Sequence, residues 1–127
     1  MNAHEKIKNV FKKVMYLNED VNIDNNKSLF LFYDMSSVDF IDFSFEIRKA
    51  FNITSQDEHL WPIKSLMSDP DYCLPENIWT DLGLKKLNEC LFLDNKHLIK
   101  NKKITSKELM EHFTIDYIIK RLNQDQK

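Results

Sequence analysis

The chain has 127 residues, of which 43% are hydrophobic and 12% aromatic, and its formal net charge is -2. This length and composition predict one globular domain with a buried core, and they exclude a disordered or collagen-like chain. The single glycine excludes the glycine-rich phosphate loops GxGxxG and GxxxxGK, and the near-neutral charge gives no general attraction to nucleic acid.

Charge is unevenly distributed along the chain. Residues 19–58 include nine acidic and three basic side chains, whereas residues 94–107 include five lysines and one aspartate. We therefore expect a negative field over the first region and a positive field over the second. A solvated surface is the ordinary interpretation of such a lysine run. We also expect segment 96–107 to fold back toward the acidic first half.

The remaining global features predict a protein of the cytoplasm. The first residues, MNAHEK, lack the apolar run of a signal peptide, and no segment has the roughly 18 apolar residues of a membrane span. Cys73 and Cys90 form no CxxC pair and are expected to be reduced thiols. No metal site is predicted, because neither HExxH nor paired Cys/His spacing occurs at His4, His59, His97 or His112.

The first half of the chain predicts two helices joined by a long loop. Apolar residues recur at helical spacing over residues 3–17, with lysines on the other side. A polar, Asn- and Asp-rich loop follows over residues 18–27. The apolar run 28–33 fits either a strand or a buried loop. Ser36, followed three residues later by Asp39, is a helix start of the capping-box type, so a helix is expected from Ser37 to about Phe51.

This second helix would carry two apolar stripes. The first stripe consists of Phe40, Phe43, Ile47, Ala50 and Phe51, and the second of Val38, Ile41 and Phe45. The polar side chains between them are Asp39, Asp42, Glu46 and Lys49. A helix of this kind lies deep in a bundle or offers its second stripe to a partner or ligand, and we expect the second stripe to be partly accessible.

The second half predicts shorter helices. All three prolines, both tryptophans and Gly83 lie within residues 61–83, which indicates helices near 61–67, 76–82 and 84–93, the second ended by Gly83 as a C-cap. Thr105 and Glu108 form another capping box, and residues 114–122 predict a last amphipathic helix. The core of this half is expected at Trp61, Trp79, Phe92 and Leu93.

The stretch Ser36-Ser37-Val38-Asp39-Phe40-Ile41-Asp42-Phe43 resembles the prosthetic-group segment of acyl carrier proteins, whose pattern is Asp-Ser-Leu-Asp followed by a helix. The helix ends in Phe51-Asn52-Ile53, where that family often has Gly-Ile, and residues 113–122 look like its closing Thr-Val-x-Asp helix. The resemblance covers residues 3–53 and about 113–122 of a single domain. It implies an all-α, acyl-carrier-like helical bundle with an inserted helical subdomain at about 54–112.

The resemblance also implies a function. Ser37 would carry covalent 4′-phosphopantetheine, whose thiol holds acyl groups as thioesters, so the chain would be a carrier and not an enzyme. The expected partners are a phosphopantetheinyl transferase and acyl-transferring or biosynthetic enzymes, and the carrier itself is expected to be a monomer. Ser36 would cap the helix, and the residues that dock the partners would be Val38, Asp39, Ile41, Asp42 and Phe45.

Three departures from the family pattern refine this expectation. Phe32-Tyr33-Asp34 stands where the family has Asp-Leu-Gly. Ser36 replaces the usual Asp, which preserves an N-cap but changes what the modifying transferase meets. Arg48 and Lys49 occupy commonly acidic positions, which favours a specialised carrier in lipid or secondary metabolism over a housekeeping fatty-acid carrier. The alternatives are a cofactor-free interaction or regulatory module, with Ser37 buried or used in capping, and a small enzyme with a Cys or His beside a base.

Overall fold

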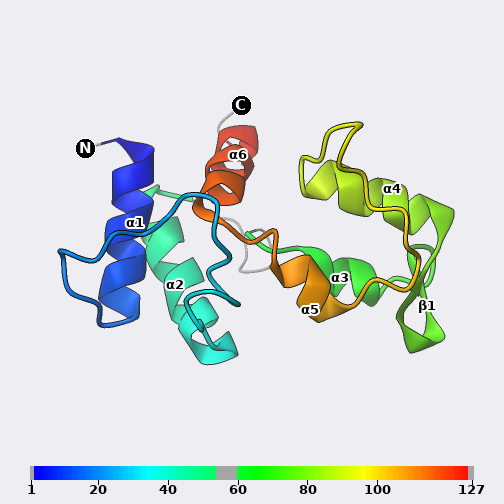
Figure 1. The fold of residues 1–127 in the computed structure, drawn as a ribbon, viewed down its shortest axis with the longest axis horizontal. Helices are drawn as coiled ribbons and strands as arrows, with labels where there is room; N and C mark the ends of the chain where they lie inside the picture. The colour runs from blue at the N-terminus through cyan, green and yellow to red at the C-terminus, as the bar shows by residue number, and fades with distance from the viewer. Residues whose placement is uncertain (1, 54–59, 126–127) are drawn as a thin grey trace.

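The structure is a computed structural model that describes residues 2–53 and 60–125, and its helices confirm a mostly α-helical fold (Figure 1). His59 and the start of the predicted insertion, residues 54–59, lie outside these ranges. No helix of the described ranges is long and apolar enough to cross a bilayer. In chain order the elements are α1 (Ala3–Val14), α2 (Ser37–Ala50), α3 (Ile63–Met67), β1 (Cys73–Leu74), the 3-10 turn η2 (Pro75–Asn77), β2 (Ile78–Trp79), α4 (Asp81–Cys90), α5 (Ser106–Met110) and α6 (Ile115–Asp125).

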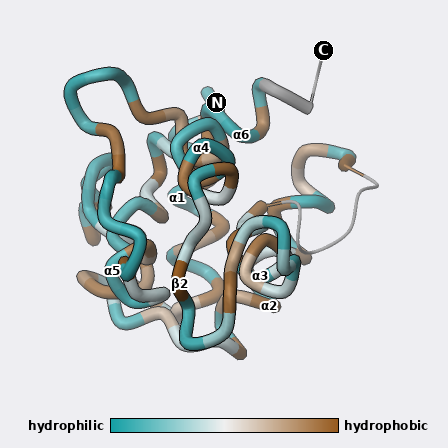
Figure 2. The backbone as a smooth tube through the Cα atoms, turned by 90° about the vertical axis from the view of Figure 1, so that its right-hand side faces the viewer, coloured by the Kyte–Doolittle hydropathy of each residue, from teal (hydrophilic) through white to brown (hydrophobic). Residues whose placement is uncertain are grey.

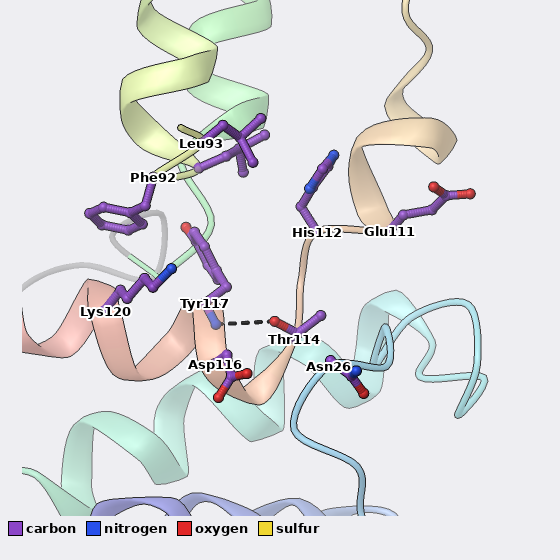
Figure 3. A pocket seen from close by; sticks show the side chains of 10 residues that line it. Asn26, Phe92, Leu93, Glu111, His112, Thr114, Asp116, Tyr117 and Lys120 are labelled. Carbon is purple, nitrogen blue, oxygen red and sulfur yellow. Dashed lines mark hydrogen bonds between the residues drawn. The ribbon is translucent and has the colours of Figure 1, made fainter. Parts of the chain in front are cut away.

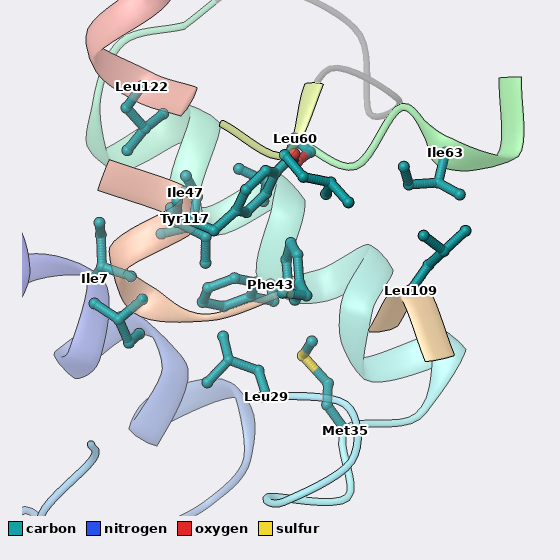
Figure 4. Close-up of a cluster of buried hydrophobic side chains, with 14 of the residues drawn as sticks. Ile7, Leu29, Met35, Phe43, Ile47, Leu60, Ile63, Leu109, Tyr117 and Leu122 are labelled. Atoms are coloured by element: carbon teal, nitrogen blue, oxygen red, sulfur yellow. The ribbon is translucent and has the colours of Figure 1, made fainter. Parts of the chain in front are cut away.

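Helices α2 and α6 both pack against α1 and form a bundle at one end of the molecule (Figure 1). Each presents one apolar stripe to a shared core, which includes Ile7 of α1, Ile47 of α2 and Leu122 of α6 (Figure 4). The rings of Phe11 and Phe43 meet edge to face, with centroids 5.8 Å apart. The amphipathic patterns read from the sequence therefore correspond to the buried faces of these helices.

The apolar run 28–33 forms turns and not a strand, with Ser28 and Leu29 buried and Phe32 exposed. The Leu29 amide donates to the Phe113 carbonyl at 2.9 Å, and the Ser28 hydroxyl donates to the Met110 carbonyl at 2.7 Å. Both partners lie just before α6, more than 80 positions along the chain. The loop between α1 and α2 is thus held against the second half of the protein, where its backbone groups are satisfied despite burial.

Three helices, α1, α2 and α4, end in the same turn without a glycine. The residue after each C-cap has a positive φ: 56° at Tyr16, 56° at Asn52 and 57° at Phe92. In each case the next amide donates to the carbonyl five positions earlier, at 2.8, 2.8 and 3.0 Å respectively, which is the Schellman ending. Helix α1 accordingly stops at Val14, before the predicted residue 17.

The second half contains a short hairpin that the sequence analysis missed. Strands β1 and β2 pair antiparallel, with Cys73 opposite Trp79, so the prediction of an all-α chain was wrong in this detail. The predicted helix at 76–82 is absent as well. The turn η2 has positive φ at Glu76 and Asn77, which reverses the chain into β2 instead of continuing as an α-helix.

Gly83 lies inside α4 and does not end a helix, which corrects its predicted role as a C-cap. Thr80 caps α4, and its hydroxyl oxygen accepts a hydrogen bond from the Gly83 amide at 2.9 Å. The carbonyl oxygen of Tyr72 occupies the space that a side-chain Cβ at position 83 would need. The glycine is therefore required by the close approach of the hairpin backbone to α4.

An aromatic cluster joins the two halves. Trp79 is fully buried among the elements of residues 60–112, as predicted, but Trp61 packs against the bundle side. The Trp61 ring lies 5.2 Å from Phe113 and 5.5 Å from Tyr117, and Phe30 lies 4.7 Å from Phe113 between ring centroids. Trp61, predicted in the core of the insertion, lies instead at the seam, where its ring meets side chains of the bundle and its loop.

The predicted approach of the lysine-rich segment to the acidic first half was also wrong. Residues 94–104 run beside α4 and β2, at the end of the long axis away from α1 and α2, and the chain then returns to α5 near the middle of the molecule (Figure 1). The stretch is largely hydrophilic when viewed from that end (Figure 2). The Ile99 amide donates to the Asn88 side chain at 2.7 Å, and the Trp79 amide donates to the Lys102 carbonyl at 2.7 Å. Local hydrogen bonds thus hold the segment where it lies.

Candidate functional site

The start of α2 is built by a capping box, as predicted. Ser36 has an extended backbone, and its hydroxyl oxygen accepts from the Asp39 amide at 3.1 Å. The Asp39 carboxylate accepts in turn from the Ser36 amide at 3.1 Å. These two residues provide the cap, so Ser37 is left as the first helical residue, and its side chain is exposed to solvent.

The backbone around Ser37 favours a negative charge. Helix geometry directs the amides of Ser37 and Val38 outward from the first turn, because they have no carbonyl one turn earlier to bond. The same end of α2 carries the positive end of the helix dipole. A phosphate ester on the Ser37 hydroxyl would therefore place its charge beside donors that suit it.

The second apolar stripe of α2 faces solvent. Val38, Ile41 and Phe45 are 67%, 57% and 54% exposed, whereas Phe43 and Ile47 on the other side are buried. The expectation that this stripe is accessible is confirmed. Three large apolar side chains on one exposed helix face are more than the scattered singles of an ordinary surface.

Acidic side chains border this stripe unequally. Asp42 is exposed, and Glu46 is partly exposed one turn later. Asp39 is partly buried, and its carboxylate is engaged by the Ser36 amide, so it has a structural role whatever else it does. The Arg48 guanidinium lies 5.9 Å from the Phe45 ring centroid, which places a positive charge at the far end of the acidic stretch.

The two cysteines are free thiols. Burial raises the pKa of the Cys73 thiol. Burial also raises the pKa of Cys90, and this effect outweighs the nearby Arg121 and Lys86 charges that lower it. Because the thiolate is the nucleophilic form, a raised pKa makes both cysteines less reactive at neutral pH.

The three described histidines, His4, His97 and His112, lie far apart in the chain and have different surroundings. His97 contacts Asp94 at 2.6 Å, and His4 contacts Asp116 at 3.4 Å, both at the surface. His112 is half-buried, and burial lowers its pKa. Across the described ranges no three His, Cys, Asp or Glu side chains are grouped to hold a metal ion.

Two cavities lie along the seam between the bundle and residues 60–112. A groove of about 470 Å³ is lined by Pro62, Leu66, Lys86, Glu89, Cys90, Phe92 and Arg121. The other cavity, of about 250 Å³, includes His112, Phe92, Tyr117 and Lys120, and the Thr114 hydroxyl accepts from the Tyr117 amide at its edge (Figure 3). Since Cys90 and His112 line different cavities, they are not paired there as nucleophile and base.

The sequence analysis missed both cavities because residues distant in the chain line each of them, and the walls of the larger groove come from α3, α4 and α6. No fixed spacing links Leu66, Cys90 and Arg121 in the chain. The α2 site, in contrast, is one continuous segment, so its local pattern was readable. Comparison with protein-family models, with curated protein sequences and with solved structures finds no significant match to this chain.

Proposed function

We propose that this chain is a carrier that bears 4′-phosphopantetheine on the Ser37 hydroxyl and holds acyl groups as thioesters for a specialised biosynthetic pathway. The start of α2 carries the proposal. Ser37 is exposed as the first helical residue, while Ser36 and Asp39 make the cap. A substituent on Ser37 would therefore leave the capping hydrogen bonds intact.

The residues around Ser37 suit the group. When bound, 4′-phosphopantetheine supplies a flexible arm that ends in the thiol on which thioesters form. The chain contributes the hydroxyl that holds the phosphodiester and the first-turn amides of Ser37 and Val38, which favour its charge. Neither task requires a residue to leave a hydrogen bond that the protein already makes.

The helix arrangement supports the same proposal. Helices α1 and α2 come from residues 3–53 and α6 begins at Ile115, yet α2 and α6 both pack against α1. We propose that residues 3–53 and 113–122 form an acyl-carrier-like core of a single domain. Residues from about 54 to 112 would then be an insertion, joined to the core by the aromatic cluster around Phe113.

Partner enzymes would dock on the face of α2 that contains Ser37. The accessible apolar side chains are Val38, Ile41 and Phe45, and the neighbouring acids are Asp39 and Asp42. Complementary charge speeds encounter more than it adds affinity, which suits a carrier that must be released after each transfer. The expected partners are a phosphopantetheinyl transferase and acyl-transferring or biosynthetic enzymes.

The second candidate is an interaction module that uses the same face of α2 without a cofactor. Its motivation is Ser36, which preserves the cap but stands where carriers have Asp. The apolar stripe would serve a protein partner equally well in this case. The exposure of Ser37 favours the carrier, since the module was expected to bury Ser37 or use it in capping.

The deciding experiment is the intact mass of the protein after incubation with coenzyme A and a broad-specificity phosphopantetheinyl transferase. The expected result is a gain of one phosphopantetheine group that is lost in Ser37→Ala. A folded protein that gains no mass with several transferases would contradict the carrier proposal and support the interaction module.

The chain offers a matched control at Ser106. This serine is also the first residue of a helix behind a capping box, formed by Thr105 and Glu108. Ser106→Ala should leave the mass gain unchanged, because the proposal assigns modification to the α2 segment and not to capping boxes in general. Loss of the gain in Ser106→Ala, with retention in Ser37→Ala, would overturn the assignment.

A further inference from the structure

Two surfaces at opposite ends of the molecule have complementary chemistry. The first is the α2 face, by which we mean the exposed apolar Val38, Ile41 and Phe45 with the acids Asp39, Asp42 and Glu46. The second is the lysine segment, residues 94–107, whose exposed cations are Lys96, Lys100, Lys102, Lys103 and Lys107. Leu98, which is 37% exposed, adds an apolar side chain among them.

The lysine segment is held in place although it contains no regular structure before α5. Asn88 of α4 clamps Ile99 from both sides, because its side chain accepts from the Ile99 amide at 2.7 Å and donates to the Ile99 carbonyl at 3.1 Å. The Lys102 carbonyl accepts from the Trp79 amide at 2.7 Å. A backbone fixed in this way loses little conformational entropy when the segment binds a partner.

The two surfaces do not meet within one molecule, because most of the lysine segment, residues 94–104, lies at the end of the long axis away from α2, and only its last residues return toward the middle in α5 (Figure 1). Within residues 2–53 and 60–125, Lys102 is the one lysine of the segment with a carboxylate in ion-pair distance, Asp81 at 2.8 Å. We propose that the lysine segment of one copy of this chain docks on the α2 face of a second copy. The second copy is the occupant because its α2 face offers both the acids and the apolar stripe that the lysines and Leu98 fit.

The contact joins two different patches, so it is head to tail and leaves one unpaired patch at each end. Open chains of weakly bound copies follow, and not a closed dimer. Because the charged side chains of both surfaces are accessible to solvent, the association is weak and strongly dependent on salt. Such docking competes with any enzyme that approaches Ser37, but it needs no cofactor and stands whether or not Ser37 is modified.

Sedimentation velocity of the unmodified protein tests the proposal. The weight-average sedimentation coefficient should rise with protein concentration at about 20 mM salt, and the rise should vanish at about 0.5 M salt. Lys100→Glu/Lys103→Glu and Asp42→Lys/Glu46→Lys should each weaken self-association by about tenfold or more, because the first removes the net positive charge of the segment and the second places cations on both surfaces. Lys102 is left unchanged to keep its pair with Asp81.

Mixing the two variants tests whether the two surfaces bind each other. In the first variant the lysine segment loses its net positive charge while the α2 face remains acidic, whereas in the second the segment remains basic and the α2 face becomes basic. The mixture should therefore associate, while each variant alone stays monomeric. Lys64→Glu/Lys120→Glu, which makes the same change of net charge as Lys100→Glu/Lys103→Glu at exposed sites on α3 and α6, should associate like the natural protein. A monomer at every concentration in low salt, or association that neither reversal weakens, would overturn the proposal.

Discussion

The bundle of α1, α2 and α6 and the lobe formed by residues 60–112 are stabilised in different ways. The bundle helices have 12, 14 and 11 residues, and each buries one apolar stripe. The lobe helices α3, α4 and α5 have 5, 10 and 5 residues, which is too short for stability in isolation. Single polar groups fix them instead, such as Thr80 at the start of α4 and Asn88 beneath the lysine segment.

This difference shows where the protein tolerates change. In the bundle the buried side chains lie on long periodic stripes, whereas in the lobe the buried side chains, such as Trp79 and Leu87, are held on short elements that also need specific hydrogen bonds and one close backbone approach. The two regions meet at Phe113, whose ring contacts Phe30, Phe40 and Tyr117 of the first region and its connecting loop, and Trp61 of the lobe. Substitutions at the seam, in the lobe and in the bundle should therefore give distinct responses.

The largest effect is expected for Phe113→Ala, which removes the common contact of both regions. Truncation of a fully buried phenylalanine should lower the free energy of unfolding by about 3–5 kcal/mol. Urea denaturation followed by circular dichroism measures this change. Phe32→Ala is the control, because Phe32 is largely exposed and should change stability by less than about 1 kcal/mol. An unchanged midpoint for Phe113→Ala would mean that the seam does not couple the regions.

Gly83→Ala should damage the lobe and spare the bundle. The new Cβ overlaps the Tyr72 carbonyl, and overpacking of this kind costs about 1–3 kcal/mol. Hydrogen exchange should accelerate in α4 and the hairpin while α1 and α2 remain protected. The helix propensity of alanine opposes this result by about 1 kcal/mol, so a gain of stability in Gly83→Ala would show that the backbone approach is not tight.

Tyr16→Gly should stabilise the bundle. Tyr16 has a φ of 56° and is 95% exposed, so glycine relieves backbone strain without loss of packing. The expected gain in the free energy of unfolding is about 0.5–1 kcal/mol. This figure is what remains once the extra conformational entropy that glycine gives the unfolded chain is subtracted. Asn52→Gly at the end of α2 should give a smaller gain, since asparagine tolerates this conformation. Equal gains at both positions would argue against strain at Tyr16.

The smallest effect is expected for His112, whose replacement should change how steeply the free energy of unfolding depends on pH. Burial lowers its pKa in the folded state, so the unfolded chain binds the proton more readily. Stability should be unaffected above the unfolded pKa of about 6.5 and should fall as the pH drops below it, down to the lowered folded pKa. Urea midpoints between about pH 5 and 7.5 test this, and His112→Asn should flatten the slope. An identical slope in the variant would place the proton uptake elsewhere.

The candidate site was predicted more completely than the lobe around it. The capping box at Ser36 and Asp39 and the inward and outward stripes of α2 were read from spacings of three and four residues, which helical geometry converts directly into position. The lobe required knowledge of distant partners. Gly83 was assigned to a helix end because glycine favours such ends, whereas its actual constraint is the Tyr72 carbonyl.

The amino-acid sequence by itself determined the mostly helical class, the caps at Ser36 and Thr105, and the buried stripes of α1, α2 and α6. These features depend on contacts between near neighbours, which local spacing specifies. Only the tertiary structure decided the hairpin, the position of Trp61 at the seam, and the placement of the lysine segment far from the acidic helix. Those features depend on which distant groups bond to buried backbone atoms or cover aromatic side chains. The hydrogen bond from the Trp79 amide to the Lys102 carbonyl is one example, and no local pattern encodes such a choice of partner.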